Sequence, residues 1–174
     1  MRRLALACAL LCAAAFSGAS AAPPPATEAA FEWFHYEGSD PVDDAQPLGP
    51  GQYRNPVIQG FHPDPSVVRV GDDFYLVTST FGWFPGLPVF HSRDLVNWTQ
   101  LGNAIDRPSQ LDFGHHDLVN GLFAPAIEHH DGRFYILNTC FPACGGNFVI
   151  TASDPAGPWS DPVWLPDLAG GVDP

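Results

Sequence analysis

The sequence predicts an all-β fold of the β-propeller type, because one segment of the chain recurs about sixty residues further along. Residues 64–79 read DPSVVRVGDDFYLVTS, and residues 124–139 read APAIEHHDGRFYILNT. Each copy then runs through a polar turn to a tryptophan, Trp98 in the first and Trp159 in the second. A long repeat built from short strands and turns is typical of propeller blades. A third copy begins at residues 172–174, where the sequence stops, so we expect about the first two blades of a larger propeller.

Each copy predicts one four-stranded antiparallel blade. In the first copy, β-branched and aromatic side chains flank Gly71-Asp72-Asp73, a pattern typical of a β-hairpin. Asp131-Gly132 is a strong hairpin signal in the second copy. The strands of the first blade are expected at residues 67–70, 74–79, 89–92 and 98–101, followed by a long connection over 102–120. Those of the second are expected at residues 126–130, 133–139, 148–152 and 159–165.

The first 21 residues have the pattern of a secretory signal peptide. Arg2 and Arg3 supply its positive start, residues 4–16 form an apolar run too short for a membrane span, and Ala-Ser-Ala at 19–21 is a cleavage site. The alternative is a buried N-terminal helix. The signal predicts a secreted protein, extracellular or periplasmic.

Two further regions follow the expected signal peptide. Residues 22–52 are rich in Pro, Ala, Asp and Gly, and we expect them to form an extended arm. Residues 53–174 are expected to form the partial propeller domain. The 17 Gly and 19 Pro of the chain agree with many turns and little helix.

The net charge of the chain limits the classes of partner that it can bind. Its 174 residues carry a formal net charge of −12 and contain no Lys. Such an acidic surface argues against nucleic acid as a partner and, once the signal is cleaved, against anionic membranes. It is consistent with a secreted protein that acts on neutral substrates.

Cysteine and histidine give only weak signals. Two of the four Cys lie in the expected signal peptide, which leaves Cys140 and Cys144 in the mature chain. In an oxidising compartment this pair can form a small disulfide. Two free thiols are the alternative, because spacing alone does not fix the geometry. The adjacent histidines at 115–116 and 129–130 would point to opposite faces of a strand, so no metal site is predicted.

Asp64 is the first candidate for chemistry. It lies between Pro63 and Pro65, which restrict the backbone on both sides, just before the first strand of its blade. The second copy has Ala124 at this place and the third has Asp173. Blade-opening strands line the central channel of a propeller, so these two carboxylates would share a pocket, as glycoside hydrolysis requires. The alternative for each Asp alone is an Asx-Pro turn that starts a strand.

Four motifs follow one another in a specific order. They are NPVIQGFHPDPS at 55–66, TSTFGWFPGLP at 78–88, HSRDLVNW at 91–98 and DRPSQL at 106–111. Together they resemble the N-terminal part of glycoside hydrolase family 43, in its β-xylosidase and α-L-arabinofuranosidase branch. The resemblance covers about residues 53–174. It implies a five-bladed β-propeller and the inverting hydrolysis of xylan- or arabinoxylan-type polysaccharides or oligosaccharides.

The resemblance also implies roles for individual residues. Asp64 would be the general base that activates water, and Asp173 would tune the pKa of the general acid and orient it. That acid is a Glu from a later blade, which the 174 residues do not supply. Phe81 and Phe123 would line the sugar pocket, although many family members have Trp in place of Phe123. Trp83 would shape the rim of the pocket, with loop packing as an equal alternative.

The remaining implications concern partners and other functions. The resemblance implies a pentose-containing oligo- or polysaccharide as partner and no cofactor for catalysis, while a calcium ion can occupy the channel of the full-length protein. The alternatives are a non-catalytic carbohydrate-binding propeller and a structural propeller. Retention of Asp64 and Asp173 argues against the first, and the secretion signal and the family motifs argue against the second. We expect the 174 residues alone to be inactive, because the general acid is absent.

Overall fold

The structure is a computed structural model of the chain, and it describes residues 45–111, 118–142, 144–168 and 171–174. The chain divides into two units, residues 1–47 and residues 48–174. The expected signal peptide, most of the Pro-rich arm and the His115-His116 pair lie outside the described residues. In the part that is described, no helix has the length and apolar character needed to cross a membrane.

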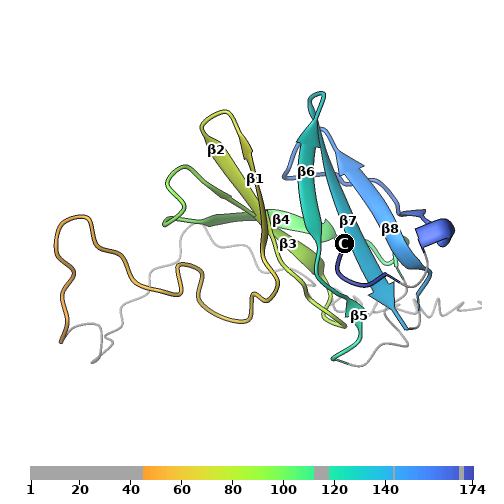
Figure 1. Cartoon of the computed structure of the whole chain (residues 1–174), viewed down its shortest axis with the longest axis horizontal. Coiled ribbons are helices and arrows are strands. Elements are labelled where there is room, and N and C mark those ends of the chain that lie inside the picture. Colours follow the sequence, from red (N-terminus) through yellow and green to blue (C-terminus); the bar gives the residue numbers. More distant parts are fainter. Residues whose placement is uncertain (1–44, 112–117, 143, 169–170) are drawn as a thin grey trace, which may run out of the picture. The chain divides into compact units, whose positions relative to one another are not determined.

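The first sheet is one four-stranded antiparallel blade, as predicted (Figure 1). Strand β4 runs on to Ile105 instead of ending at Leu101, because Ala104 and Ile105 are fully buried and Ile105 pairs with Gly86 on β3. The connection after this blade is therefore shorter than expected. The strands are β1 (Ser66–Val70), β2 (Asp73–Val77), β3 (Gly86–Ser92) and β4 (Thr99–Ile105), in the order β1-β2-β3-β4.

The second sheet has one strand more than the sequence predicts. The additional strand β5 pairs with the end of β7, and β6 pairs with the start of the same strand. The expected fourth strand is reduced to Val163–Trp164, since Pro158 and Pro162 have no N–H for the ladder. The strands are β5 (Gly121–Leu122), β6 (Ala126–His130), β7 (Arg133–Phe141), β8 (Gly146–Ala152) and β9 (Val163–Trp164), followed by the 3-10 turn η1 (Pro166–Leu168).

A single hydrophobic core joins the two sheets. Tyr75 on β2 and Phe134 on β7 meet edge to face with their ring centroids 4.9 Å apart. The Ile127 N–H donates to Ser66 Oγ at 3.1 Å, which ties β6 to β1. The core consists of the following buried side chains: Val77, Leu87, Val89, Ala104, Ile105, Leu111, Leu122, Ile127, Phe134, Ile136, Cys140, Phe148, Ile150, Ala152 and Trp159.

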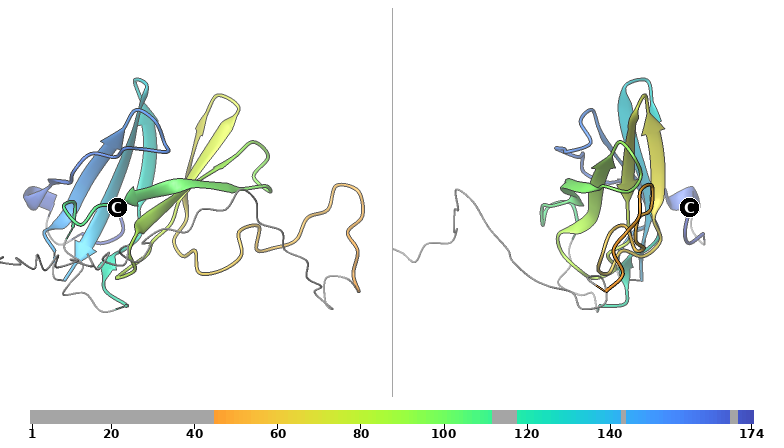
Figure 2. Two further views of the ribbon diagram at one scale, coloured as in Figure 1. Left: turned by 180° about the vertical axis from the view of Figure 1, so that it is seen from behind. Right: turned by 90° about the vertical axis from the view of Figure 1, so that its left-hand side faces the viewer.

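The two inner hairpins turn at the same end of the blades (Figures 1 and 2). Gly71, Asp131 and Gly132 have φ values of 63°, 47° and 72°, the left-handed conformation that such tight turns need. Residues that precede β1 and β6 therefore lie at the opposite end. That end carries Asp64 and Ala124.

The two cysteines outside the expected signal peptide form a disulfide. Cys140, near the end of β7, is joined to Cys144, just before β8, with the Cα atoms 5.3 Å apart. The structure supports the disulfide alternative of the sequence analysis.

Candidate active site

Asp64 lies at the opening of the first blade, two residues before β1. Its side chain is exposed and its backbone is restricted. Its φ of 53° is left-handed, a conformation that Asp tolerates better than most side chains. Its carboxylate Oδ2 accepts a hydrogen bond of 2.5 Å from Ser79 Oγ. The Ser79 N–H also donates to the Pro63 carbonyl at 3.1 Å, so Ser79, the second residue after β2, holds both the loop and the carboxylate.

Asp173 adopts the same backbone conformation, with a φ of 60°. Its Oδ1 accepts a hydrogen bond of 3.3 Å from the N–H of Ala124, the residue that replaces Asp64 in the second copy. Asp173 therefore lies at the opening of the second blade. Within the described residues no direct interaction joins it to Asp64.

Three aromatic rings make an aromatic cluster at this end of the blades. Phe81 contacts Phe123 edge to face at 5.6 Å between ring centroids, and the ring centroid of Phe61 lies 6.1 Å from that of Phe81. Phe81 is fixed by a bridge to β5. Its N–H donates to the Leu122 carbonyl at 2.8 Å, and its carbonyl accepts the return hydrogen bond from the Leu122 N–H at 3.1 Å. The structure thus brings together the two Phe residues that the sequence predicts as pocket lining.

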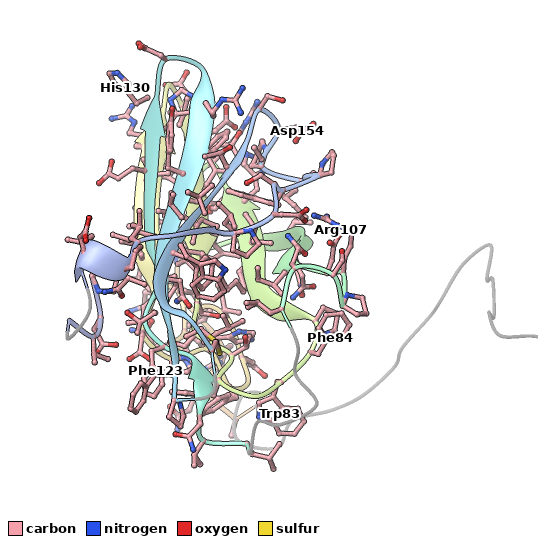
Figure 3. All side chains as sticks on the ribbon, turned by 90° about the vertical axis from the view of Figure 1, so that its right-hand side faces the viewer. Trp83, Phe84, Arg107, Phe123, His130 and Asp154 are labelled. Atoms are coloured by element: carbon pink, nitrogen blue, oxygen red, sulfur yellow. A yellow bond between two sulfur atoms is a disulfide. The ribbon has the colours of Figure 1, made fainter. Side chains whose placement is uncertain are left out.

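Trp83 lies on the loop between β2 and β3 and is 56% exposed. With Phe61 and Thr80 it lines a mostly apolar hollow of about 400 Å³. Figure 3 places Trp83 and Phe123 at the same end of the molecule, with His130 and Asp154 toward the opposite end. An exposed aromatic face suits the apolar face of a sugar ring.

A charge cluster lies at the other end of the first blade. Asp73 Oδ1 accepts hydrogen bonds from His91 Nε2 at 2.7 Å and Arg93 Nε at 2.9 Å. These two donors, His91 first, hold the pKa of the Asp73 carboxyl below its ordinary value. The cluster is separate from the candidate site.

Metal ligands do not gather in the described part of the chain. No three His, Cys, Asp or Glu side chains come together there in a way that could hold an ion. His129 lies against Phe134, and His130 forms an ion pair with Asp131 at 3.1 Å. These residues offer no donor set for the calcium ion that the resemblance allows.

Two residues of the site were missed by the sequence analysis. Phe61 immediately precedes the His62-Pro63-Asp64-Pro65 motif, and its aromatic character beside that motif was the available signal. Ser79 stands fifteen residues after Asp64, and Thr139 stands at the same distance after Ala124. The hydroxyl retained at this place in both copies could have identified Ser79.

The family model for glycosyl hydrolases family 43 matches residues 53–174. The chain belongs to this family. It is 54% identical over 116 residues to a non-reducing end alpha-L-arabinofuranosidase of Bacteroides ovatus, a match that covers 65% of this chain and 22% of the relative. It is 53% identical to a xylosidase/arabinosidase of Butyrivibrio fibrisolvens, over 69% of this chain and 23% of the relative.

Solved structures agree with this membership. A family 43 enzyme retrieved from a capybara gut metagenome matches with a TM-score of 0.68 and 48% identity, over 74% of this chain and 24% of that one. The chain thus spans less than a quarter of the length of these relatives. The predicted fold is confirmed: an all-β, five-bladed propeller of which these residues hold about the first two blades.

Proposed function

We propose that the whole protein hydrolyses O-glycosidic bonds in xylan- or arabinoxylan-type polysaccharides or oligosaccharides. The observation that carries this proposal is the placement of carboxylates at blade openings in a family 43 propeller. Asp64 opens the first blade and Asp173 lies at the opening of the second, where the repeat itself has Ala124. The names of the relatives, an arabinofuranosidase and a xylosidase/arabinosidase, support a pentose-containing carbohydrate as the substrate.

In the proposed reaction Asp64 is the general base of an inverting hydrolysis. Ser79 Oγ donates a hydrogen bond to Oδ2 of the carboxylate. Oδ1 accepts a proton from a water molecule while the water oxygen attacks the anomeric carbon. A protonated acid on the other face donates to the leaving oxygen. By resemblance this acid is a Glu outside the 174 residues, which alone would not catalyse, and Asp173 orients it and tunes its pKa.

The sugar ring is proposed to lie against the aromatic cluster of Phe61, Phe81 and Phe123, with Trp83 at the rim. The reaction breaks the C–O bond between the anomeric carbon and the leaving oxygen and forms a C–O bond to water, with the base taking a proton from the water and the acid giving one to the leaving oxygen. No oxidation or group carrier is involved, so no cofactor is proposed. The acidic chain is expected to bind neither nucleic acid nor a membrane. We also propose that residues 1–21 direct secretion, which N-terminal sequencing of the mature protein would test by finding Ala22 first.

The substitution Asp64→Asn, made in the full-length protein, tests whether Asp64 is the general base of the proposed hydrolysis. Asn tolerates the left-handed φ of 53°, so the substitution removes the base and retains the backbone. We expect kcat/KM on 4-nitrophenyl β-D-xyloside or α-L-arabinofuranoside to fall about 10²–10⁴-fold. Asp72→Asn is the matched control, because Asp72 is an exposed hairpin carboxylate at the other end of the same blade.

Two results would contradict the proposal. If Asp64→Asn retained activity within a few-fold of the native protein, Asp64 would not be the base. If the native protein hydrolysed neither substrate but bound xylan, the non-catalytic carbohydrate-binding propeller would replace it. NMR of the first-formed product anomer tests inversion separately.

A further inference from the structure

We propose that Ser79 is a positioning residue for the general base, holding Asp64 Oδ2 so that Oδ1 is the oxygen that receives the proton. This inference rests on the proposed function of Asp64. The contact itself is independent of that function, since it is a property of the first blade.

The geometry of the contact is that of a charge-assisted hydrogen bond. The separation of 2.5 Å between Ser79 Oγ and Asp64 Oδ2 lies at the short end of the range for a hydroxyl that donates to a carboxylate. The donor is fully buried, with Ser79 0% exposed, whereas Asp64 is exposed. Water therefore has little access to the hydroxyl and competes weakly for its proton.

The bond removes the main freedom that remains to the Asp64 side chain. Pro63 and Pro65 restrict the backbone around it, and the Ser79 N–H holds the Pro63 carbonyl at 3.1 Å. Rotation about the side-chain bonds would still let the carboxylate turn away. The hydroxyl limits this rotation, while Oδ1 has no hydrogen-bond partner among the described residues and is available to water.

The second copy shows that the fold does not require this particular contact. Thr139 occupies the same place there, and its Oγ1 donates to Asn147 Oδ1, because Ala124 offers no carboxylate. A buried hydroxyl is therefore compatible with the blade whether or not it meets a carboxylate. The bond to Asp64 can be removed without removing an element of the repeat.

Ser79→Ala is the direct test, carried out in the full protein product. It removes the hydroxyl but keeps the backbone N–H that bonds Pro63, so the loop stays tethered. We expect kcat to fall roughly 10- to 100-fold, the effect of losing one hydrogen bond to a charged group, with KM within about twofold. Ser79→Thr should restore most of kcat, since Thr139 shows that the blade accommodates threonine at this place.

A matched control separates positioning from stability. Ser92 is also buried, at 2% exposure, and its Oγ donates to the carboxylate Asp94 Oδ1 at 3.1 Å, at the other end of the blade. Ser92→Ala should retain kcat even where it lowers the melting temperature. If Ser79→Ala failed to fold, Ser79→Cys would give the test, because a thiol has similar volume and is a weak donor.

The outcomes distinguish this inference from the proposed function. If the native protein is active, Asp64→Asn is inactive and Ser79→Ala (or Ser79→Cys) retains full kcat, the positioning role is wrong and the base assignment stands. Equal losses of kcat in Ser79→Ala and Ser92→Ala would likewise overturn it. If Asp64→Asn is as active as the native protein, the proposed function fails, and the inference fails with it.

Discussion

Gly121 fixes the position of Phe81, and replacing it with alanine should separate the two blades at this point. Gly121 has a φ of 114°, which costs an L side chain roughly 1–3 kcal/mol. A Cβ at this position would lie 2.5 Å from the Phe81 carbonyl oxygen and 2.8 Å from its carbon, both backbone atoms that cannot rotate away. The bridge between Phe81 and Leu122 would have to open.

The cost follows from the bonds that the bridge contains. Opening it breaks two backbone hydrogen bonds, of 2.8 and 3.1 Å, each contributing roughly 0.5–1.5 kcal/mol. Together with the backbone strain, Gly121→Ala should lower the free energy of unfolding by roughly 2–6 kcal/mol. The KM for the substrate should also rise, since Phe81 would be displaced.

Gly132→Ala is the matched control for this prediction. Gly132 also has a positive φ, 72°, but no atom lies within 4 Å of the added Cβ. It should lose only about 1 kcal/mol, from backbone strain. Urea denaturation of the two variants, with unchanged m-values, measures the difference. Equal losses in the two variants would refute the role assigned to the bridge.

Two further substitutions test the packing and the electrostatics of the first blade. Gln110 is 5% exposed, and its side-chain amide donates to the Ala104 and Ser160 carbonyls at 3.0 Å each. Gln110→Ala should therefore lower the free energy of unfolding, measured by urea denaturation, by roughly 2–4 kcal/mol. A decrease below about 0.5 kcal/mol would contradict this prediction. The carboxylate of Asp94 accepts hydrogen bonds from the backbone N–H of Asn97, which has the larger effect, and from the Asn97 side-chain amide. These bonds lower the pKa of Asp94 below its ordinary value of 3.8. The charged carboxylate therefore stabilises the fold fully above pH 3.8, and this stabilisation is lost as the pH falls below that value. Asp94→Asn should therefore lower the melting temperature at pH 7, and the difference from the native protein should shrink below pH 3.8; a difference independent of pH would count against the charge.

Local turn chemistry made much of this fold predictable. Gly71 and Asp131-Gly132 marked both inner hairpins, and the β-branched and aromatic side chains around these turns marked the strands. Strand β5 was not predictable in this way, because it has two residues and forms through pairing with the distant Phe81 and Phe141. Such non-local pairs leave no periodic signal in a short window.

The candidate site shows the same division. Asp64 was predictable because its prolines and its place in the repeat mark it. The partner of its carboxylate, Ser79, lies fifteen residues away. The repeat marks a hydroxyl at this place, but its contact with Asp64 forms only because β1 and β2 pair and bring their ends together. The roles of Asp64 and Asp173 stay predictions until the variants are measured.

The correspondence between Asp64, Ala124 and Asp173 bears on how such a scaffold can evolve. The strands and hairpins that stabilise each blade are repeated, whereas the blade-opening position is Asp in the first and third copies and Ala in the second. Stability and reactivity therefore depend on different positions. A single substitution at a blade opening can add or remove a carboxylate while the hairpin behind it stays intact, so duplicated blades can diverge in chemistry without having to diverge in architecture.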